Sequence, residues 1–130
     1  MPRWSLLLVL AVAACGGDGE CPLIGCVSQL TVQLPAGAAS ARACVDEVCS
    51  SDVVDGAVQV PLGRRGEGGT VPLSVEVADA AGATTTVTGD AAVQRNRPNG
   101  VGCPPVCVVG TVRVDPATGS LVAVEADAKS

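Results

Sequence analysis

The sequence predicts an all-β protein, a small antiparallel sandwich of about eight short strands stapled by disulfides. Apolar residues alternate with polar ones at a period of two along much of the chain, which is typical of strands that bury one face. Turn-forming Gly, Pro, Asn and Asp residues separate these stretches at short intervals. Seven cysteines in 130 residues provide cross-links for a chain of one small domain's length.

Residues 1–14 are typical of a secretory leader. A short head that contains Arg3 is followed by an apolar run from Leu6 to Val12. A membrane-spanning helix needs about 20 apolar residues, so this run is too short to cross a bilayer. We therefore predict that residues 1–14 are a signal peptide that is removed on export.

The end of this leader, Val12-Ala13-Ala14-Cys15, resembles the lipobox of bacterial lipoproteins. The resemblance implies that Cys15 becomes the lipidated first residue and that the protein is anchored to the bacterial cell envelope, outside the cytoplasm. Residues 15–20 would then form a lipid anchor and a Gly-rich tether, whose five flexible residues reach only about 12 Å. The alternative is ordinary signal cleavage that leaves Cys15 as a plain thiol.

Four strands are predicted in the first half of the domain. Residues 30–34 alternate Leu and Val with Thr and Gln, and residues 39–45 alternate Ala and Val with Ser and Arg. A Val-rich stretch at 48–54 is the third strand, and residues 58–62 again place Val and Leu on one face. Turn signals separate these strands at positions 35–37, 46–47 and 55–56.

Four more strands are predicted in the second half. Residues 73–77 alternate Leu and Val with Ser and Glu, and residues 84–93 and 106–114 are runs rich in β-branched side chains. A shorter run at 121–125 follows. Turn signals lie at positions 63–69, 79–82, 98–100 and 115–119.

This pattern resembles an immunoglobulin-like sandwich in its architecture. We predict a single domain over residues 21–125 and a frayed tail at 126–130. Without its leader the chain has no aromatic residue, so its core must consist of Val, Leu and Ala, which bury less area than rings. Disulfides are the expected compensation.

The odd number of cysteines is consistent with both a lipid and disulfides. If Cys15 is lipidated, six cysteines remain, which can form three bridges in an oxidising compartment. They are Cys21, Cys26, Cys44, Cys49, Cys103 and Cys107. The chain has no histidine and these cysteines form no C-x2-C pair, so neither a zinc site nor a thioredoxin-like redox motif is predicted.

One bridge follows from hairpin geometry. A two-residue turn at Asp46-Glu47 would place Cys44 opposite Cys49 at a non-hydrogen-bonded position, where the Cα atoms lie about 4.5 Å apart. This spacing suits a disulfide, so we predict Cys44–Cys49. A longer loop remains open, because Asp-Glu lacks the glycine usual in such turns.

The other two bridges are predicted from the Pro-Pro pair between Cys103 and Cys107. An extended polyproline-like segment would separate these two cysteines by about 12 Å. A bridge between them would need a bend after Pro105 or a cis proline. We therefore predict that they pair with Cys21 and Cys26. Strand direction, which would place Cys26 near Cys107 at one end of the sandwich, favours the pairs Cys26–Cys107 and Cys21–Cys103.

The composition argues against catalysis and nucleic-acid binding. Without its leader the chain has seven basic and thirteen acidic residues, no His and no ring, so it would repel nucleic acid and cannot stack bases. No neighbouring base would activate a serine nucleophile. Four nearby carboxylates could in principle serve a glycosidase or bind calcium, but a solvated hairpin edge is expected. They are Asp46, Glu47, Asp52 and Asp55. No enzyme activity, cofactor or metal is predicted.

The function predicted is that of a non-enzymatic cell-envelope lipoprotein, a binding or structural surface module with an unknown partner. The alternative is an inhibitor of a secreted protease that acts through the loop at residues 95–107. Basic residues and prolines beside two cysteines could make this loop a stiff insert with a low ordering cost. They are Arg95, Arg97, Pro98, Pro104 and Pro105. A third reading, a carrier of small apolar ligands, would require a large apolar cavity.

Strand direction predicts one further feature. If successive strands reverse, all six cysteines of the domain lie at one end of the sandwich, the end at which the tether enters. Four arginines fall at the same end. They are Arg64, Arg65, Arg95 and Arg97. Because anionic headgroups attract basic residues, we predict that this end faces the membrane and that the opposite, Asp-tipped end meets partners. The alternative is that these arginines serve solubility alone.

Overall fold

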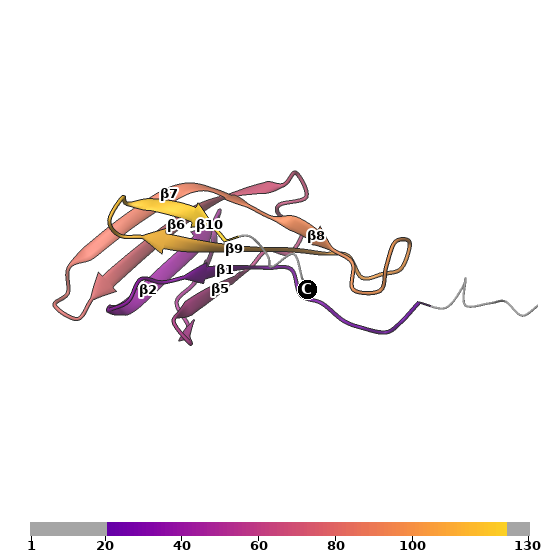
Figure 1. Cartoon of the computed structure of the whole chain (residues 1–130), viewed down its shortest axis with the longest axis horizontal. Helices are drawn as coiled ribbons and strands as arrows, with labels where there is room; N and C mark the ends of the chain where they lie inside the picture. Colours follow the sequence, from indigo (N-terminus) through magenta and orange to yellow (C-terminus); the bar gives the residue numbers. More distant parts are fainter. Residues whose placement is uncertain (1–20, 125–130) are drawn as a thin grey trace, which may run out of the picture.

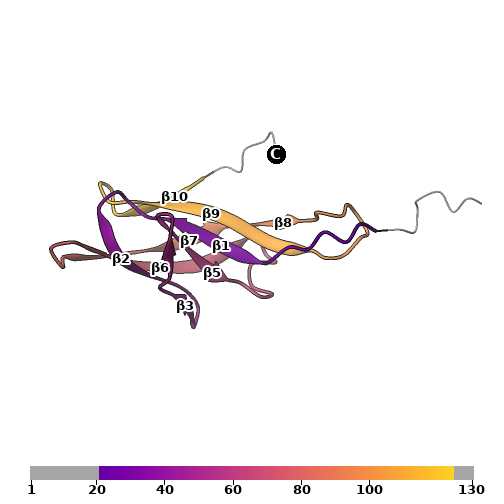
Figure 2. The ribbon, with the colours of Figure 1, turned by 90° about the horizontal axis from the view of Figure 1, so that it is seen from below.

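The computed structural model describes residues 21–124, which form ten strands in two sheets (Figures 1 and 2). The predicted fold class, a small β-sandwich stapled by disulfides, is confirmed, and its strand pairs are mainly antiparallel. The strands are β1 (Gln29–Gln33), β2 (Ala38–Val45), β3 (Val48–Ser50), β4 (Val53–Val54), β5 (Ala57–Pro61), β6 (Thr70–Asp79), β7 (Thr84–Ala92), β8 (Gln94–Asn96), β9 (Cys107–Asp115) and β10 (Ser120–Ala123). The predicted signal peptide, lipidated tether and tail lie outside the described residues.

The larger sheet has the order β10-β9-β1-β5-β4, with β8 also paired to β9. β1 lies in the middle, antiparallel to β5 but parallel to β9, so that Thr31 is opposite both Gln59 and Thr111. The parallel pair departs from the fully antiparallel sandwich that the sequence predicts. It arises because an even number of chain reversals separates β1 from β9, and the two strands are then brought side by side.

The smaller sheet has the order β3-β2-β6-β7, and all of its pairs are antiparallel. One stretch predicted as a single strand is divided between the sheets. Residues 48–54 give β3, which pairs with β2, and β4, which pairs with β5. The predicted strand at 84–93 forms β7. After buried Val93, residues 94–96, which the sequence does not predict as a strand, form β8 of the other sheet. A period of two does not record a change of sheet, so the sequence predicts fewer strands.

The core between the sheets is built from aliphatic side chains contributed by both of them. Its members are Leu30, Val32, Ala41, Ala43, Val45, Val58, Val60, Leu62, Val71, Leu73, Val75, Val77, Val87, Ala91, Val93, Val108, Val112 and Val114. Close approach of the sheets depends on Gly110, where a Cβ atom would lie 2.7 Å from the carbonyl oxygen of Ala92. Within residues 21–124 no helix is long and apolar enough to span a bilayer.

The connections sort to two ends, as strand reversal predicts. The cysteine end comprises residues 21–28, 46–47, 63–69 and 97–106; the aspartate end comprises the turns at 35–37, 55–56, 80–83 and 116–119. An ion pair between Arg65 and Asp46 joins two connections of the cysteine end. In Figure 1 the long orange loop before β9 and the indigo N-terminal segment project together from this end.

Candidate functional site

The most distinctive part of the molecule is the projection at the cysteine end, which we call the terminal lobe and define as residues 21–28 and 97–107. Two disulfides tie its segments together, with Cα–Cα distances of 5.4 Å for Cys21–Cys103 and 6.1 Å for Cys26–Cys107. Both pairings are those expected from the sequence. The lobe is therefore a cross-linked unit formed by segments more than 80 residues apart.

The third disulfide lies on the β2–β3 hairpin. Cys44 is opposite Cys49 and Val45 is opposite Val48, so Asp46-Glu47 forms the predicted two-residue turn. The Cα–Cα distance of the bridge is 4.0 Å. Asp46 takes a positive φ of 53°, which lets the turn close without the glycine that is usual there.

A buried asparagine organises the interior of the lobe. The Asn99 side chain is only 8% exposed, and its Oδ1 accepts a hydrogen bond from the N–H of Ile24 at 3.1 Å. Its Nδ2 donates to the carbonyl oxygens of Ile24 at 2.9 Å and Pro104 at 2.7 Å. This role is not apparent from the sequence, because Asn between Pro98 and Gly100 indicates only a turn.

Further main-chain bonds hold the lobe in shape and join it to the sheets. The N–H of Gly100 donates to the carbonyl oxygen of Arg97 at 3.0 Å. At the base, the Oγ of Ser28 accepts from the N–H of Val108 at 3.0 Å. The peptide bond between Pro104 and Pro105 is cis, so this segment is not the extended trans form that the sequence predicts.

The surface of the lobe is apolar. Leu23 is 100% exposed and Val101 is 87% exposed, and three other large aliphatic side chains of the lobe are also exposed. These are Ile24, Val27 and Val106. In the rest of the described chain, the exposed large hydrophobic side chains are the two valines of β4. The lobe contains no Asp or Glu, and its one charged residue is Arg97.

The four arginines predicted to share an end do so in the structure. The N–H of Val93 donates to the carbonyl oxygen of Gly69 at 2.9 Å, which places the loop with Arg64 and Arg65 beside the start of β8. Arg95 lies on β8, and Arg97 follows it into the lobe.

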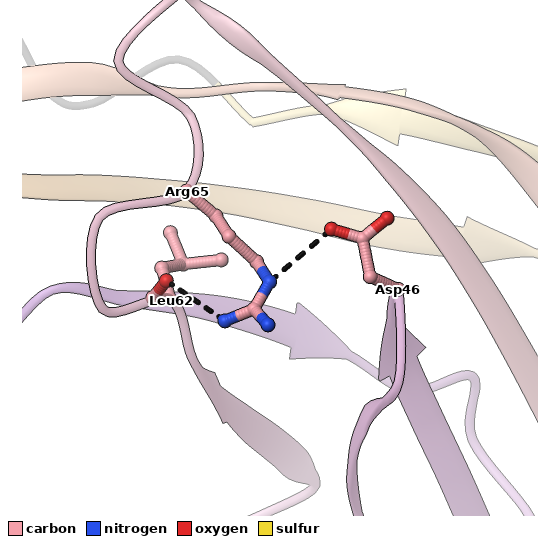
Figure 3. A network of polar contacts seen from close by, with 3 residues as sticks. All are labelled: Asp46, Leu62 and Arg65. Carbon is pink, nitrogen blue, oxygen red and sulfur yellow. Dashed lines mark hydrogen bonds and ion pairs between the residues drawn. The ribbon is translucent and has the colours of Figure 1, made fainter.

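One of these arginines, Arg65, makes contacts within the protein (Figure 3). The Nε of Arg65 lies 3.2 Å from Oδ2 of Asp46, and its terminal nitrogen donates to the carbonyl oxygen of Leu62 at 3.5 Å. Arg65 is therefore less available to an external anion than Arg95 or Arg97, both of which are exposed.

The four acidic residues of the hairpin region do not form one cluster. Asp46 and Glu47 lie at the cysteine end, whereas Asp55 lies in the β4–β5 turn, whose Gly56 carbonyl accepts from the N–H of Leu34 at 2.9 Å. Asp52 lies between these positions, on the link from β3 to β4. Residues 21–124 contain no group of three or more Cys, Asp or Glu side chains placed to hold a metal ion.

The hollows of the described surface are open depressions. One of about 450 Å³ lies where β8 and β10 meet β9, and polar and apolar residues share its lining, among them Thr31, Gln94 and Val124. Another, of about 170 Å³, lies at the aspartate end between Pro35 and Pro116. The space between the sheets is occupied by the aliphatic core.

These features define a small disulfide-bonded β-sandwich with a cross-linked, apolar lobe at one end. Its three bridges indicate an oxidising environment outside the cytoplasm. Comparisons with protein-family models, with curated proteins and with solved structures gave no match.

Proposed function

We propose that this protein is an exported lipoprotein, anchored through Cys15, that presents its β-sandwich at the cell envelope as a non-enzymatic binding or structural module. The pairing of the cysteines is the observation that carries the proposal. All six cysteines within residues 21–124 are in disulfides. The seventh, Cys15, is the residue at which the lipobox-like sequence Val12-Ala13-Ala14-Cys15 ends. Lipidation accounts for an odd cysteine in an oxidising compartment.

The position of the lobe supports a defined orientation on the membrane. Cys21, the first cysteine of the lobe, follows Cys15 by six residues, and a random coil of five residues would span about 12 Å. The cysteine end would therefore rest near the bilayer. The aspartate end, where Asp79 and Asp115 are the last residues of β6 and β9, would face away and meet any partner.

Intact mass and membrane attachment test the anchor. Protein extracted from membranes should begin at Cys15 and exceed the unmodified chain by an acylated glyceryl group, and Cys15→Ser should release it from the membrane. The matched control is the double variant Cys44→Ser with Cys49→Ser, which also replaces cysteines by serine but keeps Cys15, and it should remain attached. Unchanged attachment of Cys15→Ser would contradict the proposal.

A second candidate function is inhibition of a secreted protease through residues 95–107. The observation that favours it is the stiffness of this loop, which two disulfides and the Asn99 hydrogen bonds hold in place. A pre-organised insert loses little entropy on binding. The purified domain should then form a stable complex with a trypsin-like protease, which Arg97→Gln should weaken and Arg64→Gln should not. Cleavage after Arg95 or Arg97 without inhibition would exclude this function.

A further inference from the structure

We propose that the terminal lobe inserts its exposed aliphatic side chains into the headgroup region of the bilayer that holds the lipid anchor. The inference rests on the proposed lipoprotein function and deepens it, because it assigns the lobe a ligand of its own, the lipid surface. The sandwich would then be held upright at two points, the acylated Cys15 and the lobe, instead of swinging on a flexible tether.

The distribution of apolar surface is the first argument. A core of Val, Leu and Ala fills the sandwich, yet the lobe leaves Leu23, Val101 and three other aliphatic side chains in water. Contiguous exposed apolar surface marks a protein or membrane interaction site. Five such side chains on 19 residues, with no acidic neighbour inside the lobe, form a surface suited to a lipid environment.

Part of the main chain of the lobe needs no water to satisfy its polar groups. Unpaired N–H and C=O groups are costly in a bilayer, so irregular loops are normally excluded from it. Four positions of the lobe are proline and have no N–H to satisfy: Pro22, Pro98, Pro104 and Pro105. The Asn99 side chain satisfies three further groups, on Ile24 and Pro104. An insertion of about 5–10 Å, the depth typical of interfacial elements, fits such a loop.

Distance favours the bilayer over a protein partner as the occupant. The five residues between Cys15 and Cys21 would span about 12 Å as a random coil and at most about 20 Å when fully extended. A small protein domain is about 30 Å across, so it would not fit between the lobe and the membrane. Arg97 belongs to the lobe and Arg95 precedes it on β8. Both side chains are exposed, so lipid phosphates would meet them there.

The mature chain offers a clean optical test, because its leader carries the only Trp of the sequence and an introduced indole is therefore a unique reporter. The lipidated protein would be reconstituted in phosphatidylcholine vesicles containing phosphatidylglycerol, with Leu23→Trp or Val101→Trp in the lobe. Ala81→Trp, exposed in a turn of the aspartate end, is the matched control. Brominated lipids should quench the lobe reporters and blue-shifted emission should accompany this, while the control reporter should behave as in water.

Three results would count against the proposal in distinguishable ways. The lipidated protein could float with the vesicles while aqueous iodide still quenches the Trp emission of the lobe reporters. This result would overturn insertion and leave the lipid anchor intact. Such a result assigns the apolar surface to a protein. Equal lipid quenching at Leu23→Trp and Ala81→Trp overturns the orientation. A chain that carries no lipid overturns the proposed function, and with it the insertion that rests on it.

A charge-matched pair tests the apolar contribution without the anchor. In the Cys15→Ser background, Leu23→Asp should lower partitioning into the same vesicles by about tenfold or more, the loss expected when one large aliphatic side chain no longer enters the membrane. Ala81→Asp makes the same change in charge at the aspartate end and should have little effect. Absence of alkylation without reductant shows that each variant has kept its disulfides. Equal partitioning of the two variants would overturn the proposal.

Discussion

The two ends of the sandwich are built by different means. At the aspartate end, short turns close on themselves: Oδ1 of Asp79 accepts from the N–H groups of Ala81 at 2.9 Å and Ala83 at 3.0 Å. Oδ1 of Asp115 accepts from the N–H of Ala117 at 2.9 Å. At the cysteine end, the lobe is held by bonds between segments separated by 75 residues or more, namely two disulfides and the pairing of Asn99 with Ile24.

The difference shows where each end obtains its stability. A turn that satisfies its own main chain forms wherever its few residues allow it, and it needs no distant partner. The lobe exposes its aliphatic side chains, so hydrophobic burial does not stabilise it, and covalent and polar cross-links must. The cysteine end should therefore be sensitive to single substitutions that leave the aspartate end unaffected.

The largest effect is expected from removal of both lobe disulfides by alanine at Cys21, Cys26, Cys103 and Cys107. The two bridges close nearly the same long loop, with sequence separations of 82 and 81. Loop-closure entropy for such a loop corresponds to about 4–5 kcal/mol of stability. Guanidinium unfolding should show this loss of stability. In hydrogen exchange, the amides of the lobe should lose protection more readily than those of the turn at 80–83.

The hairpin bridge is the internal comparison for that experiment. Cys44–Cys49 closes a separation of only 5 residues, so the same reasoning gives about 2 kcal/mol for its removal. A hairpin variant that loses more stability than the lobe variant would contradict the view that the long-range bridges dominate.

Two glycines with the same backbone angle make the next comparison. Gly66 has φ +87° and Gly82 has φ +86°, but a Cβ at Gly66 would lie 2.7 Å from Cγ2 of Val93, whereas Gly82 has open space. Gly82→Ala should cost about 1–2 kcal/mol from its positive φ alone. Gly66→Ala should cost about 1–3 kcal/mol more, because the methyl group overpacks the core. Equal urea-unfolding midpoints for the Gly66→Ala and Gly82→Ala variants would show that the loop at 63–69 shifts to accommodate the added methyl group.

The buried asparagine should matter more than an exposed aspartate that makes a similar number of bonds. Asn99→Ala leaves the Ile24 and Pro104 main-chain groups unpaired inside the lobe, at a cost of about 1–3 kcal/mol. Asp79→Ala frees two N–H groups that water can reach, and should change stability by only about 0.5 kcal/mol. Thermal unfolding of the two variants measures the contrast, and a reversed order would argue that the lobe is not an ordered unit.

The smallest effect is expected for the ion pair between Arg65 and Asp46, whose side chains are 40% and 50% exposed. A double-mutant cycle with Arg65→Gln and Asp46→Asn should give a coupling of about 0.2–1 kcal/mol, reduced by salt. Arg64→Gln provides the control, with no coupling to Asp46→Asn. A coupling that is insensitive to salt would show that the pair is shielded from solvent.

The sequence by itself determined the local structure of this protein. Alternation at a period of two located most of the strands, because side chains of a strand point to opposite faces and one face must be buried. The spacing of Cys44 and Cys49 around a two-residue turn predicted their bridge, although the residues Asp46-Glu47 also left a longer loop open. Strand reversal sorted the cysteines and arginines to one end, and that sorting favoured the pairing of Cys26 with Cys107.

Only the tertiary structure decided which distant segments meet. It placed β1 between β5 and the parallel β9, and it moved the chain from one sheet to the other at Ser51–Asp52 and at Val93. It also brought Asn99 to Ile24, and it left the side chains of Leu23 and Val101 exposed. The physical reason is that alternation records that a face is buried but not what buries it; pairing and exposure depend on contacts between segments far apart in the chain.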